Sequence, residues 1–163
     1  MKLFLIIKQV GFSKFVLAGI SEVYRKVIRE KFYGSYAQDY EDILMEKLLP
    51  MKNGFYLEIG GYHPSRLSNT FRFYKKGWRG VVVEPNPEAK KLFENLRPAD
   101  KFISKGIGVR SGKLDYFKYE IPALNTFDKQ QVARNKTNGY KVTKIVEVEI
   151  FEINKFLTKY IKQ

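Results

Sequence analysis

Residues 53–64, NGFYLEIGGYHP, contain a short apolar run that ends in an acidic residue and two glycines. Phe55, Tyr56 and Leu57 lead into Glu58, and Gly60-Gly61 follow. This pattern is typical of a buried parallel strand that reaches a tight turn. Because glycine lacks a Cβ atom, the backbone of such a turn can lie close to a ligand. The stretch therefore predicts a strand followed by a binding turn.

A second stretch, residues 80–87 (GVVVEPNP), repeats the arrangement about two dozen residues later. Here Val81, Val82 and Val83 lead into Glu84. A glycine turn after one strand and a carboxylate at the end of the next are the features of a Rossmann-like nucleoside site, in which the carboxylate accepts hydrogen bonds from a ribose diol. The order and spacing of the two stretches are more specific than either one alone.

Working outward, the alternation of apolar periodicity and turn signals predicts an α/β domain with a parallel sheet and right-handed crossovers. The predicted elements are a helix over 36–49 capped by Ser35, strands at 55–59 and 81–83, helices over 65–76 and 88–96, and a third strand over 102–109 that forms a hairpin with 113–119; a weak helix or mobile segment over 128–138, a strand over 141–150 and a helix over 153–161 follow. In the 88–96 helix, the predicted buried face consists of Ala89, Leu92, Phe93 and Leu96.

Length and composition fit one folded domain. The chain has 163 residues, of which 44% are hydrophobic and 15% aromatic, a composition that argues against disorder over the whole length. It contains no cysteine, which excludes disulfides and thiolate metal sites and is compatible with a reducing cytoplasm. No His/Asp/Glu cluster has metal-ligand spacing, so the sequence predicts no metal site.

The formal net charge of +13 favours contact with nucleic acid, anionic lipid or an acidic substrate. The alternative is a lysine-rich surface without a specific partner, which the even spread of the charges favours. Nucleic acid is the weakest of these partners, because no recognised nucleic-acid motif accompanies the charge.

Residues 1–34 form a basic, partly apolar extension that the pattern predicts to be helical. Seven Lys or Arg residues precede residue 34, against Glu22 and Glu30. No apolar run approaches the about 18 residues that a spanning helix needs, and Lys8 interrupts the apolar run at 3–7 that a signal peptide would need. Such a helix either lies on an anionic membrane surface or packs against its own domain or a partner.

Several motifs in the same order resemble the FkbM family of S-adenosylmethionine-dependent methyltransferases. They are residues 35–42 (SYAQDYED), 54–61 (GFYLEIGG) with His63-Pro64, 67–70 (LSNT), 73–80 (FYKKGWRG), 84–88 (EPNPE) and 122–127 (PALNTF). The resemblance runs from about residue 35 to the C-terminus. It implies a class I methyltransferase fold, with residues 35–163 as the domain that binds S-adenosylmethionine, and methyl transfer to an oxygen of a small or glycan-like acceptor.

The resemblance also implies roles for individual residues. Glu58 lies where the family has the acidic residue near the methionine end of the cofactor, and Gly60 and Gly61 lie beneath that end. Glu84 corresponds to the residue that binds the ribose hydroxyls. The further cofactor-binding residues implied by family position are Pro85 and Asn86, which flank the adenine, and Gln38 and Glu41, which line the cleft.

Two departures from the family pattern affect these expectations. Glu58 replaces the usual aspartate, which keeps the charge but changes its reach. The family continues with a further strand that ends in an acidic motif, whereas this sequence stops at Gln163. We therefore expect a truncated parallel sheet with an uncovered strand edge, which favours self-association as a homo-oligomer. The alternative function is a truncated, non-catalytic binding or interaction domain, acting on an anionic surface.

Three side chains leave alternatives open. His63 is the only histidine and lies beside the glycine turn, so it is the candidate general base; the alternative is that it shapes the turn. Trp78 is expected to pack in the core rather than to stack on a ligand. Asn69 either faces the cleft or lies on a helix surface. A Ser–His–Asp triad has no support in the sequence.

Overall fold

The computed structural model of the chain describes residues 12–161. The apolar run at 3–7 therefore lies outside the described residues. The described residues divide into two compact units, of which one combines residues 12–33 with Asp115–Glu147 and the other combines Gly34–Leu114 with residues 148–161. All residues predicted for the site belong to the second unit.

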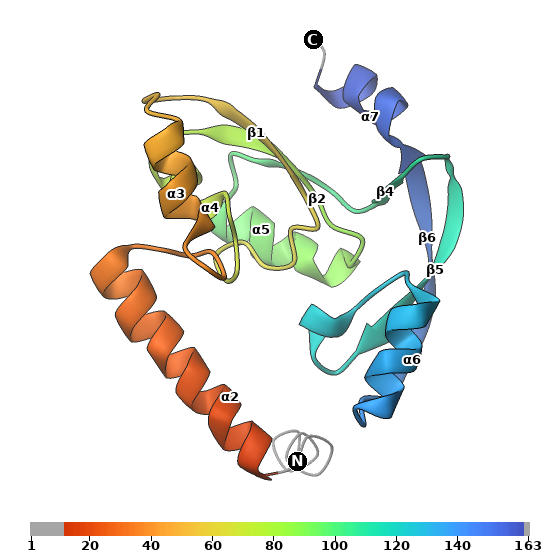
Figure 1. The fold of residues 1–163 in the computed structure, drawn as a ribbon. Helices are drawn as coiled ribbons and strands as arrows, with labels where there is room; N and C mark the ends of the chain where they lie inside the picture. Colours follow the sequence, from red (N-terminus) through yellow and green to blue (C-terminus); the bar gives the residue numbers. More distant parts are fainter. Residues whose placement is uncertain (1–11, 162–163) are drawn as a thin grey trace. The chain divides into compact units, whose positions relative to one another are not determined.

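Three parallel strands form the central sheet of the second unit (Figure 1). Their order is β1 (Phe55–Ile59), β2 (Arg79–Val83) and β3 (Lys101–Ile103). The first and last residues of β1 pair with the first and last residues of β2, so both strands end at the same edge. The three valines of β2 are buried, as expected for a central strand covered on both faces. Both strands are confirmed where the sequence predicts them.

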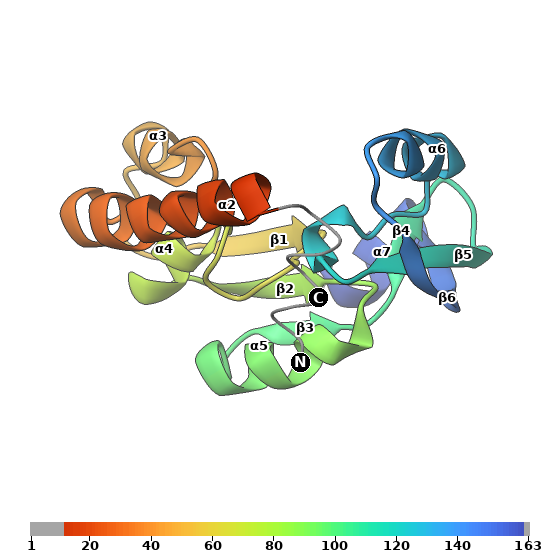
Figure 2. The ribbon, with the colours of Figure 1, turned by 90° about the horizontal axis from the view of Figure 1, so that it is seen from below.

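Helices α5 and α7 supply side chains to the two opposite faces of this sheet. Figure 2 shows the three strands side by side, with α5 next to β3. Val82 packs against Ala89 and Phe93 on one face. Val81 and Val83 pack against Phe156 on the other. The helices of this unit are α3 (Glu41–Leu48), α4 (Phe71–Lys75), the 3-10 helix η2 (Pro87–Ala89), α5 (Lys90–Leu96) and α7 (Ile153–Tyr160).

The helix predicted over 36–49 begins later than expected. Tyr40 has a left-handed φ of 65°, so α3 starts only at Glu41. Ser35 is not the helix cap that the sequence suggests, because its Oγ donates to Asp42 Oδ1 at 2.7 Å. Asp42 Oδ2 also accepts from the backbone N of Tyr36 at 2.7 Å. The buried carboxylate of Asp42 thus holds residues 35–40 in a non-helical conformation.

The helix predicted over 65–76 is wrong in its first half. Leu67 has φ of 53°, which interrupts a helix, and α4 spans only Phe71–Lys75. Ser68 and Thr70 direct their hydroxyls to Glu58 of β1. These tertiary contacts override the helical periodicity. Trp78 is buried beside Phe73, with ring centroids 5.0 Å apart, which confirms the predicted core role.

The predicted buried face of the 88–96 helix is half correct. Ala89 and Phe93 are buried, but Leu92 is 44% exposed and Leu96 47%. Ala89, the last residue of η2, and Phe93 of α5 pack against Val82, whereas the two leucines of α5 are in contact with solvent.

A second sheet has the order β4 (Gly106–Gly108), β6 (Val142–Glu152) and β5 (Gly112–Tyr119), with β4 parallel to β6. The predicted third strand over 102–109 therefore divides between two sheets. Between the two parts of this segment, the backbone N of Lys105 donates a hydrogen bond to Ile103 O, two residues earlier, where the chain turns from one sheet to the other. The predicted hairpin with 113–119 is also wrong, because β6 lies between β4 and β5. Strand β6 and helix α7 are confirmed.

The remaining described elements are α2 (Phe12–Tyr24), a π-helical stretch η1 (Arg25–Tyr33), the 3-10 helix η3 (Pro122–Leu124) and α6 (Lys129–Thr137). The weak helix predicted over 128–138 is confirmed, and Asp128 caps it by accepting from Gln130 N at 2.7 Å. None of the helices among residues 12–161 is long and apolar enough to cross a membrane.

Candidate functional site

The turn after β1 is built on two glycines whose backbone is tied to β2. Gly60 N donates to Val83 O at 2.8 Å and Gly61 N donates to the same oxygen at 3.2 Å. Gly60 has a φ of 82°, which favours glycine, and a Cβ atom built on it would meet no heavy atom within 4 Å. A Cβ atom on Gly61 would lie 2.4 Å from Val82 Cγ1. The turn is therefore packed underneath at Gly61 and open above Gly60.

The carboxylate of Glu84 joins this turn to the end of β2. Its Oε2 accepts from Tyr62 N at 2.8 Å, and its Oε1 accepts from Asn86 N at 2.7 Å. Glu84 is only 4% exposed. Asn86 Oδ1 in turn accepts from Glu88 N at 3.4 Å, at the start of η2. One buried carboxylate thus sets the geometry of two loops at the carboxyl edge of the sheet.

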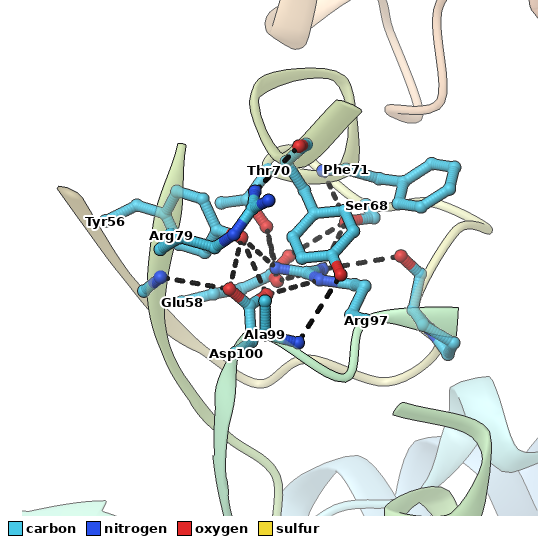
Figure 3. Close-up of polar contacts among 12 residues, drawn as sticks. Tyr56, Glu58, Ser68, Thr70, Phe71, Arg79, Arg97, Ala99 and Asp100 are labelled. Carbon is cyan, nitrogen blue, oxygen red and sulfur yellow. Dashed lines mark hydrogen bonds and ion pairs between the residues drawn. The ribbon is translucent and has the colours of Figure 1, made fainter. Parts of the chain in front are cut away.

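The side chain of Glu58 points from β1 into a polar cluster (Figure 3). Its Oε2 accepts from Thr70 Oγ1 at 2.6 Å and from Arg97 Nη1 at 3.0 Å. Its Oε1 accepts from Ser68 Oγ at 3.2 Å. We call Tyr56, Glu58, Ser68, Thr70, Arg97 and Asp100 the Arg97 cluster.

Arg97, at the C-terminal end of α5, is the centre of this cluster, and its side chain has no exposed surface. Its Nε donates to Asp100 Oδ2 at 2.7 Å, and its Nη2 donates to Thr70 Oγ1 at 2.8 Å and to Tyr56 Oη at 3.0 Å. Tyr56 Oη also donates to Asp100 Oδ2 at 2.6 Å. Asp100 Oδ1 accepts from Gly80 N at 3.0 Å, which links the cluster to β2. A planar guanidinium is suited to such a branched set of acceptors.

Burial dominates the ionisation of the cluster. It raises the pKa of Glu58, while the charge of Arg97 and the hydroxyls of Thr70 and Ser68 act in the opposite direction. Burial also raises the pKa of Tyr56, with a contribution from its hydrogen bond to Asp100. For Arg97, burial acts to lower the pKa, but the carboxylate of Glu58 and the other partners more than offset it, and the pKa is raised. The guanidinium is therefore the fixed charge on which Glu58 depends.

A cavity of about 390 Å³ lies along β1 and reaches the glycine turn. Its wall is mostly apolar, with the polar groups gathered near the carboxyl end of the strand. The apolar part is formed by Met45, Leu49, Phe55, Tyr56, Leu57, Ile59, Leu67, Phe73 and Trp78, and the remainder by Glu58, Gly60, Asn69 and Thr70. Two side chains of the Arg97 cluster, Glu58 and Thr70, therefore belong to the polar part of the cavity wall.

A family model described as the methyltransferase FkbM domain matches residues 58–163. The chain belongs to this family. The resemblance that the motifs indicate is thereby confirmed from Glu58 onward, whereas the motif at 35–42 lies before the match. No curated protein and no solved structure matches the chain.

The residues that the FkbM resemblance predicts to bind the cofactor fall into three groups by their position in the structure. Gly60, Gly61, Glu84 and Asn86, with Pro85 between the last two, meet at the ends of β1 and β2 as expected. Glu58 lies close by, but its carboxylate is engaged by Arg97, Ser68 and Thr70.

Gln38 and Glu41 form the third group, and they do not line the cavity. Glu41 Oε2 accepts from Asp39 N at 2.7 Å, within the loop that precedes α3, and Gln38 is exposed. Their predicted role in the cofactor cleft stays a prediction. Of the residues near them, it is Met45 and Leu49 that reach the cavity wall.

His63 shapes the chain beyond the glycine turn. Its Nδ1 accepts from Ser65 N at 3.2 Å and from Arg66 N at 3.1 Å. In the neutral ring, an accepting Nδ1 places the proton on Nε2. These contacts fit the turn-shaping alternative, and the general-base role stays a prediction. Among the described residues, no group of His, Asp and Glu is arranged to hold a metal ion.

The sequence reasoning missed Arg97, Ser68, Thr70 and Asp100. One signal was available. Tyr56 and Glu58 are two residues apart on β1, so their side chains lie on the same face of the sheet and both need polar partners there. Nothing local identifies those partners, because Arg97 is 39 positions from Glu58.

Proposed function

We propose that this chain has a Rossmann-like class I methyltransferase fold and binds S-adenosylmethionine across the ends of β1 and β2. The proposed reaction is transfer of the methyl group to a hydroxyl oxygen of a small or glycan-like acceptor. The observation that carries the proposal is the buried carboxylate of Glu84, held by one backbone amide from each loop. In open parallel sheets, nucleosides bind beyond the carboxyl ends of the strands, with an acidic residue on the ribose.

The residues at this edge fit the cofactor. The backbone of Gly60 has no neighbour on its open side within 4 Å of a Cβ position, so a ligand can lie against it. Two amides orient Glu84 before a ribose arrives, and the family resemblance assigns the flanks of the adenine to Pro85-Asn86, which follow Glu84 directly. The carboxylate of Glu58 and the hydroxyl of Thr70 lie at the cavity wall beside Gly60, on the side proposed for the methionine end.

When bound, the cofactor supplies an electrophilic methyl group on a sulfonium. The contribution of the protein is then to hold the acceptor hydroxyl in line and to exclude water, for which proximity is the main source of rate. The apolar part of the cavity wall, which includes Ile59 and Leu67, would exclude water on one side of Gly60.

The test is calorimetric titration of S-adenosylmethionine and S-adenosylhomocysteine into the full chain, into Glu84→Gln and into Glu94→Ala. Glu94 is an exposed carboxylate beside Lys90 and serves as the matched control. Hydrogen bonds to a charged group are worth about 1.5–3 kcal/mol, so Glu84→Gln should weaken binding roughly 10- to 150-fold. Glu94→Ala should bind as the natural chain does. A folded natural chain that binds neither ligand would refute the proposal, and equal binding by Glu84→Gln would refute the ribose assignment.

A separate observation favours a second role for α2. Leu17, Ile20 and Val23 are 65%, 61% and 62% exposed, and Tyr24 is 51% exposed, at spacings that place them along one side of a helix. The sequence up to Tyr33 carries seven basic and two acidic residues. Within the described residues, α2 itself carries one Lys and one Glu, and the basic residues gather in η1, which follows α2 directly. An apolar stripe continued by a basic segment is typical of helices that lie in an anionic membrane interface. We propose an anionic lipid surface as its partner.

Vesicle flotation tests this role. The full chain should float with vesicles that contain anionic phosphatidylglycerol and not with neutral ones, and Leu17→Ser with Ile20→Ser should abolish flotation. Val109→Ser, at an exposed valine outside α2, is the control and should float normally. Equal flotation of the α2 variant, or none by the natural chain at low salt, would refute the role.

A further inference from the structure

Arg97 connects three stretches of chain that are separate in sequence. From the end of α5, its guanidinium contacts Glu58 of β1, Thr70 of the loop before α4, and Asp100 just before β3 (Figure 3). It also donates to the carbonyl of Pro64 at 3.4 Å. Among residues 12–161, few side chains of this size are as completely buried.

Arg97 does not itself line the cavity, but it holds groups that do. Glu58 and Thr70 both contribute to the cavity wall beside Gly60, and Thr70 bonds to Glu58 Oε2 as well as to Arg97 Nη2. Asn69 lies between Ser68 and Thr70, which are both anchored in the Arg97 cluster. The position of the polar part of the wall therefore depends on the guanidinium.

We propose that Arg97 is a positioning residue of the cofactor site, which fixes the carboxylate of Glu58 beside Gly60 for the charged amino-acid end of S-adenosylmethionine. This inference rests on the proposed function. The α-ammonium group of the ligand is a cation, and a fixed carboxylate is its natural partner.

The charges around Glu58 explain why Arg97 is needed. The groups that face this carboxylate are Arg97 from α5 and Ser68 and Thr70 from the loop. Tyr56 of β1 and Asp100 before β3 bind the same guanidinium. Arg97 is the cation of this set. Burial of a carboxylate disfavours its charged form, and a nearby opposite charge restores it. Without Arg97, the pKa of Glu58 should therefore rise further, and the site should lose its carboxylate at neutral pH.

The first experiment measures the affinity for S-adenosylmethionine between pH 6.5 and 9 by calorimetry. Relative to the natural chain at each pH, Arg97→Met should bind at least tenfold more weakly at pH 7 and should recover as the pH rises and Glu58 ionises. Glu58→Gln and the double variant Glu58→Gln with Arg97→Met should stay equally weak at every pH. The matched control is Arg72→Met, which breaks the ion pair of Arg72 with Glu46 at 2.5 Å without touching the Arg97 cluster. It should leave affinity and pH profile unchanged.

The two variants that lack Arg97 also guard against a folding defect. Arg97→Met leaves the buried carboxylates of both Glu58 and Asp100 without their cation, whereas the double variant leaves only that of Asp100. The double variant should therefore melt at a higher temperature than Arg97→Met. An Arg97→Met protein that is folded and binds with natural affinity would overturn the proposal. So would a loss of affinity that does not depend on pH, since that would indicate a purely structural role.

Hydrogen exchange separates this proposal from the proposed function. In Arg97→Met, the amides of Ser68 and Phe71 should exchange faster relative to those of β2, and in Arg72→Met they should not. If the natural chain binds no cofactor but this exchange pattern is found, the proposed function fails while the anchoring by Arg97 stands. If exchange at these amides is unchanged in Arg97→Met, the anchoring itself is refuted.

Discussion

Gly61→Ala offers a direct measure of how tightly the glycine turn packs on the sheet. A Cβ atom at this position would lie 2.4 Å from Val82 Cγ1 and 3.1 Å from Phe93 Cζ, and both neighbours are buried. The first contact is about 1 Å shorter than an ordinary van der Waals distance, so the sheet or the turn must shift. Overpacking of this kind costs about 1–3 kcal/mol, and we expect the upper half of that range because neither neighbour has space to move.

A double-mutant cycle with Val82→Ala tests the cause of this loss. Val82→Ala alone should cost about 2 kcal/mol, at ~0.8 per buried carbon plus a cavity. In the double variant, the new methyl group occupies the space that the valine leaves, so its total cost should be about 1–2 kcal/mol less than the sum of the single costs. The assay is urea unfolding followed by circular dichroism, with the free energy extrapolated to water.

Gly112→Ala is the matched control, because a Cβ atom there would meet nothing within 4 Å. It should be neutral or should stabilise by about 0.4–1 kcal/mol, by restricting the unfolded chain. If Gly61→Ala is as harmless as Gly112→Ala, or if its cost simply adds to that of Val82→Ala, the close contact between the turn and β2 is not what limits the site.

Three further predictions concern stability. Burial raises the pKa of Glu58 above the about 4.3 of an unfolded chain, so its contribution to stability is present at low pH and is lost as the pH rises through the folded value. The free energy of unfolding of Glu58→Gln, measured by urea titration at several pH values, should therefore lack this loss. A pH dependence identical to that of the natural chain would contradict a raised pKa for Glu58. Hydrogen bonds from the backbone N of Asn154 and of Lys155 lower the pKa of Glu152. Its stabilising cap on α7 should therefore be present above about pH 4.3 and should be lost as the pH falls through the pKa of the folded state. In thermal melts at acid pH, Glu152→Gln should not show this loss of stability. Phe156→Ala should cost about 3–5 kcal/mol in urea unfolding, since the ring is fully buried against Val81 and Val83; a loss below 1 kcal/mol would show that α7 does not depend on this contact.

The parts of the fold that the sequence predicts well are those decided by neighbouring residues. Strands β1 and β2 follow from apolar runs, and their ends follow from Gly60 and Glu84. The position of Glu84 at the carboxyl edge of the sheet could be predicted because this residue directly follows a parallel strand. The same local logic identifies α7, whose apolar side faces Val81.

The parts that escape prediction depend on partners distant in sequence. The 65–70 segment has helical periodicity, yet Ser68 and Thr70 gain more from Glu58 and Arg97 than from a continued helix. The pairing of β4 with β6 joins residues more than 40 positions apart, whereas a hairpin with β5 would have been local. Pattern reading cannot weigh such long-range bonds, because the sequence does not show which groups meet.

The bonds that hold Glu84 have a consequence for how this family can change its sequence. Its carboxylate contacts the main chain at positions 62 and 86 rather than their side chains. Any residue except proline supplies the same donor, so the side chains at these two positions can be exchanged without removing a hydrogen bond to the carboxylate. Tyr62 has a left-handed φ of 46°, and glycine or asparagine would adopt this conformation at lower cost. The position of the Glu84 carboxylate thus depends on the main chain at positions 62 and 86, and not on which side chains these positions carry.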